Sequence, residues 1–330
     1  MSSTLFEQLH ADGHLSSESL QKIKLSKANT LFSVYWELKT ILYLGVLLLS
    51  GGLGILIYKN IDTLGHQAIL FFIAALCASS FFYCFKNKLP YSNNRVAAPN
   101  AFFDYILLLA CLMFITFVGY LQYQYNVFGN RYGLVTFIPM IVLFFTAYYF
   151  DHIGILTMAI TTLAAWAGIS VTPMALLSKN DFNSLTIIFT AFALGVVLVT
   201  LGYFSAKENI KKHFEFTYNN FGIHLLFIST LAAMFHYEKI CLLIFILLAV
   251  IGYLVYQKAA KEKSFYFLLI LSLYIYIGFS YLVTKLLFDI MQVDTENVVL
   301  ACLYFIASAI GIMIFLIRMN IQFKNNDSIQ

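Results

Sequence analysis

YGLVTFIPMIVLFFTAYYFDHIGILTMAITTLAAWAGISVTPMAL, residues 132–176, contains Asp151 and His152 as its only acidic or basic side chains. A bilayer core of about 30 Å requires about 20 apolar residues per helix, because backbone polar groups in lipid must bond within their own segment. This stretch holds two such runs, and only Asp151 and His152 divide them. It therefore predicts two membrane-spanning helices joined by a tight turn.

The rest of the chain has the same character. Of its 330 residues, 61% are apolar and 11% are charged, and the mean hydropathy is +0.82. A soluble domain carries about 25% charged residues, so this composition excludes a water-soluble globule. It predicts an all-α polytopic integral membrane protein with about ten transmembrane helices, at residues 40–58, 67–85, 101–122, 132–150, 153–176, 185–205, 217–235, 240–256, 264–288 and 297–317.

The basic residues support this division. Ten spans place fifteen of the twenty Lys and Arg residues on the side of the two termini. The other side holds the remaining five, which are Lys59, Arg131, Lys179, Lys239 and Lys285. Cytoplasmic loops carry an excess of Lys and Arg, so both termini are predicted to be cytoplasmic. The turn at Asp151 and His152 contains neither residue type, so the count does not test the division there.

Three parts are expected along the chain: a cytoplasmic helical hairpin at 1–39, a transmembrane domain at 40–318 and a cytoplasmic tail at 319–330. In the hairpin, Ser16 is suited to cap the second helix. The hairpin either docks a cytosolic or membrane protein partner or packs its apolar faces at the membrane. Nucleic-acid binding is not expected, because its four lysines are balanced by four acids, Glu7, Asp12, Glu18 and Glu37.

The N-terminal region also carries a family resemblance. LFEQLHADGHLSSESLQKI, residues 5–23, leads into the glycine-punctuated YLGVLLLSGGLGILIYKNIDTLGHQAI, residues 43–69. Over roughly residues 5–85 this arrangement resembles a bacterial predicted-membrane-protein family, domain of unknown function 2157. The first span of that family ends in Asn followed by Trp, and here Ile61 follows Asn60. The resemblance implies a bacterial inner-membrane protein and transfers no catalytic residue or cofactor, because the family has no established activity.

One predicted span carries an ordered polar stripe. Tyr274, Gly278, Tyr281, Lys285 and Asp289 follow the i, i+4, i+7, i+11, i+15 spacing of one helix face. Ionisable groups inside a span cost about 2.5–3.5 kcal/mol on insertion scales, which makes them candidates for function. The stripe would suit a substrate or proton route. Alternatively, the lysine reaches the membrane interface and the tyrosines pack internally.

Two more ionisable residues are candidates for the same polar site. His224 lies about two turns into the seventh span, where it could shuttle protons or serve as a hydrogen-bonded packing residue. Asp104 lies in the first turn of the third span, where the helix dipole alone accounts for an acid. Elsewhere, Ala307 and Gly311 have the spacing of small residues at a close helix contact.

The sequence contains no HExxH or GxSxG signature, so an enzyme is not expected, and no cofactor or metal is predicted. We expect a structural or accessory inner-membrane protein whose partners are membrane lipids and any protein bound by residues 1–39. The alternative is a secondary transporter of a small or lipophilic solute, built from five plus five helices. Convergence of His224, Tyr281, Lys285 and Asp104 on one cavity would favour the transporter.

Overall fold

The computed structural model describes residues 16, 18–19, 35–59, 65–171, 185–262, 264–290 and 295–327, and within these ranges the regular structure is entirely helical. The chain divides into two compact units, Met1–Lys59 and Asn60–Gln330. In the first, α3 (Tyr35–Lys59) is a single long helix. The predicted hairpin at 1–39 lies mostly outside the described residues, but the Ser19 N–H donates to Ser16 Oγ at 3.2 Å, which is the predicted cap.

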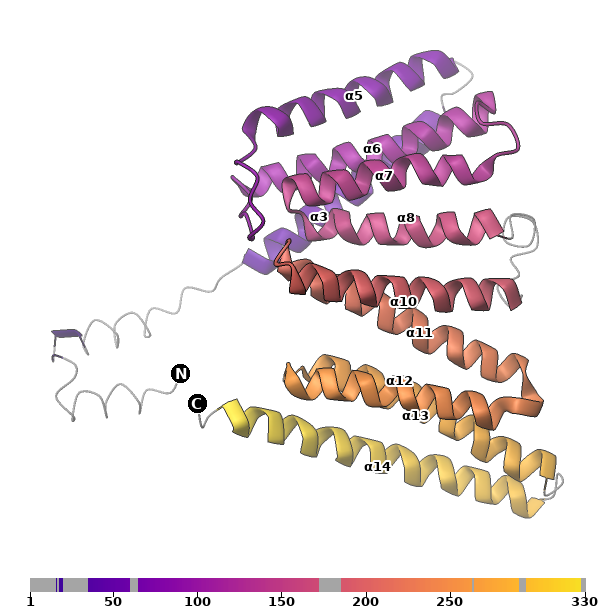
Figure 1. The fold of residues 1–330 in the computed structure, drawn as a ribbon. Helices are drawn as coiled ribbons and strands as arrows, with labels where there is room; N and C mark the ends of the chain where they lie inside the picture. Colours follow the sequence, from indigo (N-terminus) through magenta and orange to yellow (C-terminus); the bar gives the residue numbers. More distant parts are fainter. Residues whose placement is uncertain are drawn as a thin grey trace. The chain divides into compact units, whose positions relative to one another are not determined.

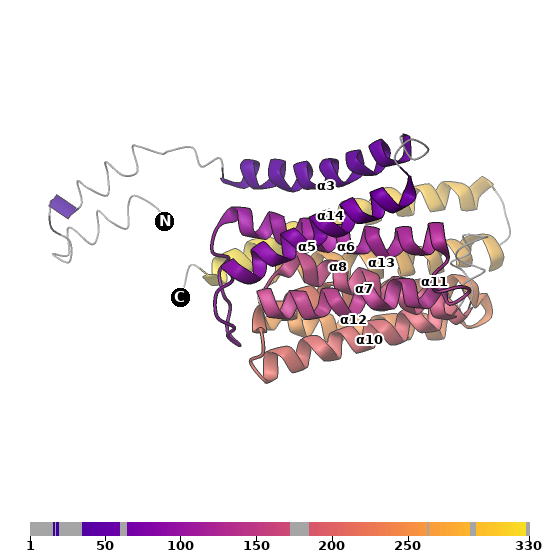
Figure 2. The same cartoon turned by 90° about the horizontal axis from the view of Figure 1, so that it is seen from above.

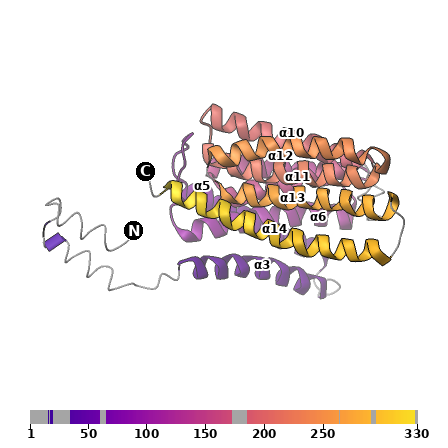
Figure 3. The same ribbon diagram turned by 90° about the horizontal axis from the view of Figure 1, so that it is seen from below.

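The second unit is a bundle of antiparallel helices that follow one another in chain order (Figure 1). Figures 2 and 3 view these helices from the α5 side and from the α14 side. Its long helices are α5 (His66–Asn87), α6 (Ala101–Tyr125), α7 (Tyr132–Phe150), α8 (Ile153–Val171), α10 (Leu185–Lys207), α11 (Glu215–His236), α12 (Cys241–Lys261), α13 (Phe265–Lys285) and α14 (Thr295–Asp327). Three short helical segments join them, η1 (Lys212–Phe214), η2 (Glu238–Ile240) and the π-helix η3 (Leu286–Ile290).

Each of the ten predicted spans coincides largely with one long helix, and the bounds of α7 are those predicted. The tight turn is also confirmed, because α7 ends at Phe150 and α8 begins at Ile153. Within the described residues, nine helical segments are long and apolar enough to cross a membrane. The chain is therefore an all-α polytopic membrane protein. The helix that does not reach this level of hydropathy is α11.

The polarity of α11 follows from its position. It packs against α8, α10, α12 and α13, and eleven of its residues are buried, including the polar Thr217, Asn219, Ser229 and Thr230. A helix that is covered by other helices along half of its residues needs a smaller apolar surface toward lipid. Its hydroxyl groups are satisfied locally, since Ser229 and Thr230 both donate to the Leu226 carbonyl.

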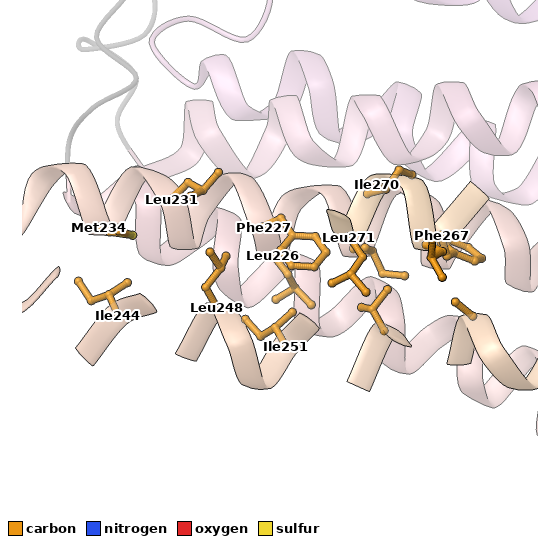
Figure 4. Packing of buried hydrophobic residues seen from close by; sticks show 14 of the residues in the cluster. Leu226, Phe227, Leu231, Met234, Ile244, Leu248, Ile251, Phe267, Ile270 and Leu271 are labelled. Atoms are coloured by element: carbon orange, nitrogen blue, oxygen red, sulfur yellow. The ribbon is translucent and has the colours of Figure 1, made fainter. Parts of the chain in front are cut away.

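Two hydrophobic clusters meet at α10 and α11. One joins α11, α12 and α13, and Figure 4 shows its packing around Phe227, Leu248 and Leu271. The other joins α5, α6, α7, α8 and α10 to Phe214 and Tyr218 at the start of α11. Because lipid tails are as apolar as leucine, such clusters stabilise a membrane bundle through dense van der Waals packing and hydrogen bonds between helices.

The α10–α11 contact brings two backbones together at glycines. A Cβ on Gly222 would lie 2.7 Å from Val199 Cγ2 and 3.0 Å from the Gly195 carbonyl oxygen, and a Cβ on Gly195 would lie 3.0 Å from the Gly222 carbonyl oxygen. The prediction that Gly311, spaced four residues from Ala307, lies at a close helix contact is wrong, because a Cβ added to Gly311 would meet nothing within 4 Å. Small residues permit a close approach but do not show where it occurs.

Four connections lie at one end of the bundle: α5–α6, α7–α8, α10–α11 and α12–α13 (Figure 1). We call this the Asp151 end. The opposite end carries the 126–131 loop and the η2 segment. Alternation of helix direction therefore brings together loops that are far apart in the sequence.

Candidate functional site

Asp151 is the centre of a buried polar cluster at the Asp151 end. It caps α7 in the left-handed conformation (φ 60°), a region that Asp and Asn tolerate better than most residues. Its carboxylate is 1% exposed and accepts from three groups: the Val96 N–H, His213 Nε2 and Lys211 Nζ, the last at 3.0 Å. A single acid thus joins the turn to the α5–α6 loop and the α10–α11 loop.

Lys211 is the buried cation of this cluster. Its side chain is 1% exposed, and its ammonium group also donates to the Asn94 carbonyl at 3.3 Å and lies 5.0 Å from the centre of the Tyr91 ring. Its backbone N–H donates to the Asn93 carbonyl at 2.8 Å. The α5–α6 loop therefore wraps around Lys211, and the ion pair with Asp151 holds that loop against the α10–α11 loop.

His152, the second residue of the turn, serves α8 and α6. Its Nδ1 accepts from the Ile155 N–H at 3.1 Å, which caps the start of α8, and its Nε2 lies 3.8 Å from Asp104 Oδ1. Asp104 therefore lies beside His152 of the turn, in addition to its position at the start of its own helix. Asn100 caps the start of α6, because its Oδ1 accepts from the Phe103 N–H at 2.8 Å.

An open polar pocket of about 490 Å³ lies next to this cluster. Its walls come from the α5–α6 loop, the α10–α11 connection, the first turns of α11 and the end of α12. They are formed by Asn94, Arg95, Asn209, Lys212, His213, Glu215, Phe216, Asn219 and Glu262. His213 belongs to both features, since it lines the pocket while its Nε2 contacts Asp151. The buried cluster therefore fixes one wall of the pocket.

The two acids of the pocket are already paired. Lys258 Nζ lies 2.6 Å from Glu215 Oε1 and 2.9 Å from Glu262 Oε1. Arg95 and Lys212 form no ion pair with any other residue that the structure describes. The charges of Glu215 and Glu262 are thus partly compensated by Lys258, whereas those of Arg95 and Lys212 in the pocket wall are not compensated by any described acid.

Within the bundle, two predicted site residues meet. His224 Nδ1 and Tyr274 Oη are 2.8 Å apart, and the Tyr274 ring stacks on Phe227 with ring centres 5.0 Å apart. The pair joins α11 to α13. A similar link between Tyr148 Oη and Tyr218 Oη, at 2.9 Å, joins α7 to α11.

We expect Tyr274→Phe to lower the free energy of unfolding by about 0.5–2 kcal/mol, because His224 would lose a hydrogen bond between helices. Thermal unfolding in detergent measures this change. Tyr253→Phe is a matched control on α12, since Tyr253 is 61% exposed. Equal stability of the two variants would contradict a structural role for the His224–Tyr274 contact.

The remainder of the predicted stripe also faces α11 and its η2 connection. The Tyr281 ring packs edge-on against Phe235, and Lys285 Nζ donates to the Glu238 carbonyl at 2.9 Å and lies 3.6 Å from its carboxylate. Because the α-helix gives way to the π-helix at Leu286, the α-helical spacing does not continue to Asp289. The side chain of Asp289 lies outside the described residues.

The structure thus separates the predicted site residues into three places. His224 and Tyr274 form one pair inside the bundle, Tyr281 and Lys285 contact the opposite end of α11, and Asp104 lies beside His152. The sequence did not predict the cluster of Asp151, Lys211 and His213. Lys211 stands in a basic loop, and the only local signal was an acid in a two-residue turn.

These features define a polytopic membrane protein with a buried ionic cluster and an open polar pocket at one end of its bundle. The family model described as Predicted membrane protein (DUF2157) matches residues 7–156, so this part of the chain is similar to that family. The match confirms the resemblance and extends it beyond residue 85, as far as the Asp151 turn and the first residues of α8. No curated protein and no solved structure matches the chain significantly.

Proposed function

We propose that the chain is a non-catalytic accessory protein of the bacterial inner membrane that presents a rigid binding pocket to the cytoplasm. The observation that carries this proposal is the position of the Asp151 cluster directly behind the pocket wall. Sites that bind with defined geometry need side chains held by supporting contacts. Here the buried ion pair fixes the loops that supply Asn94, Arg95, Lys212 and His213.

The distribution of basic residues supports a cytoplasmic Asp151 end. That end holds Lys86, Lys88, Arg95, Lys207, Lys211, Lys212, Lys258 and Lys261, whereas the opposite end of the second unit holds Arg131, Lys239 and Lys285. An excess of Lys and Arg is typical of cytoplasmic loops. The C-terminal end of α14 lies at the Asp151 end as well, which supports a cytoplasmic C-terminus (Figure 1).

The orientation is tested by single cysteines in a background where the five native cysteines are replaced by alanine. Asn94→Cys lines the pocket, and Asn130→Cys is its matched control in the exposed loop at the opposite end. With a membrane-impermeant maleimide added to intact spheroplasts, we expect Asn130→Cys to react and Asn94→Cys to react only after the membrane is opened. The reverse pattern would overturn the proposed orientation.

A second cysteine separates binding from transport. His224 lies inside the bundle, where a transporter that alternates access would expose it to each side in turn. We expect His224→Cys to remain unreactive toward the impermeant maleimide in intact spheroplasts while Asn130→Cys reacts. Modification of His224→Cys from the Asn130 side would favour the transporter and contradict the accessory function.

A further inference from the structure

We propose that the pocket at the Asp151 end binds a phosphate group. This inference deepens the proposed function, because it names the ligand chemistry of the same pocket. It rests on the charges that line the pocket, on the groups those charges already contact, and on the orientation of α11.

The cations of the pocket are available for a ligand and its acids are not. Glu215 and Glu262 are both held by Lys258 at 2.6 and 2.9 Å, so their charge is largely compensated within the protein. Arg95 and Lys212 are exposed and line the same pocket without an ion partner among the described residues. A guanidinium group offers a planar fork to a phosphate, and an ammonium group adds a point charge.

The backbone adds to this preference. The pocket includes Glu215, Phe216 and Asn219 from the first turns of α11, a helix of 22 residues. The N-terminus of a long helix carries a partial positive charge and favours anions. Glu215 already lies there, but its carboxylate is turned to Lys258 and also accepts from Asn219 Nδ2 at 3.3 Å. The anion is therefore placed toward Arg95 and Lys212, away from the two glutamates.

The volume of the pocket, about 490 Å³, exceeds that of an inorganic phosphate ion. The pocket therefore has room for a phosphate group that is part of a larger molecule, either a soluble phosphate ester or a phospholipid whose headgroup enters the pocket. Both share the chemistry that Arg95 and Lys212 recognise, and two probes distinguish them.

The test uses the full chain purified in a maltoside detergent and phosphate-free buffer. Inorganic phosphate is titrated in one arm, and binding is measured by calorimetry. In the other arm, dilute phosphatidylglycerol is added in mixed micelles, and the lipid that remains bound is counted by native mass spectrometry. The double variant Arg95→Gln/Lys212→Gln removes the two cations, and Arg131→Gln/Lys239→Gln makes the same change of charge at the opposite end.

We expect at least one probe to bind the unchanged chain. Its Kd should rise about tenfold or more in Arg95→Gln/Lys212→Gln and stay within about twofold in the control, because charge-assisted hydrogen bonds would be lost in the first variant alone. Binding of phosphate supports a soluble ester, and binding of phosphatidylglycerol alone supports a headgroup. Failure of both probes to bind, or equal weakening in the two double variants, would overturn the proposal. The cysteine-labelling experiment would still test the orientation separately.

Discussion

Asp151→Asn should lower the free energy of unfolding by about 3–5 kcal/mol, because it leaves the ammonium group of Lys211 buried without a counter-charge. Asparagine keeps the size of the side chain and tolerates the left-handed backbone at this position, so the change isolates the charge. Unfolding in detergent can be followed with a thiol-reactive dye, since Cys77, Cys84, Cys111 and Cys241 are buried in the folded protein.

Asp151→Asn/Lys211→Met is the decisive companion variant. It removes both charges, and replacing a buried ion pair by neutral groups is often close to neutral in stability. We therefore expect the double variant to recover most of the stability that the single variant loses, which is a coupling that a double-mutant cycle measures. A loss below about 1 kcal/mol in Asp151→Asn, the range of surface pairs, would contradict the buried cluster.

Gly222→Ala should cost about 1–3 kcal/mol, because the added methyl group would lie 2.7 Å from Val199 Cγ2 and 3.0 Å from backbone atoms of α10. The contact joins the two hydrophobic clusters of the bundle, so a displacement of α10 would loosen both. The same unfolding assay measures the change.

Gly311→Ala on α14 makes the same substitution where a Cβ would meet nothing within 4 Å. It should leave stability unchanged or raise it slightly, because alanine favours a helix over glycine by about 0.5–1 kcal/mol. If Gly222→Ala were as stable as Gly311→Ala, the backbone contact between α10 and α11 would not be as close as described.

Hydropathy and charge placement predicted the helices well, for a physical reason. A span needs about 20 apolar residues, and a turn needs polar ones, so the sequence marks both directly. The two-residue turn at Asp151 was also predicted from the sequence. The contacts of α11 with four other helices were not predicted, although Asn219, Asn220 and His224 in one span were a signal that part of this helix is covered by protein.

The site was less predictable because its contacts depend on which helices are neighbours. His224 and Tyr274 were each singled out, but 50 residues separate them and only the packing of α11 on α13 brings them together. Lys211 was counted as one of many cytoplasmic lysines, and nothing near it in the sequence shows that it is buried against Asp151. The spacing of the ninth span indicated a continuous face, but the π-helix at Leu286 interrupts it.

A cytoplasmic phosphate-binding pocket at the Asp151 end is tested by the rate at which Asn94→Cys is modified in inside-out membrane vesicles. Asn94 lines the pocket, and its backbone carbonyl, which contacts Lys211, is retained in the variant. We predict reaction with an impermeant maleimide in these vesicles, slowed by inorganic phosphate and not by chloride at equal ionic strength, with Asn130→Cys unreactive. Modification of Asn94→Cys in intact spheroplasts would contradict the cytoplasmic position of the pocket, and a rate in the vesicles that phosphate leaves unchanged would contradict binding of a soluble phosphate.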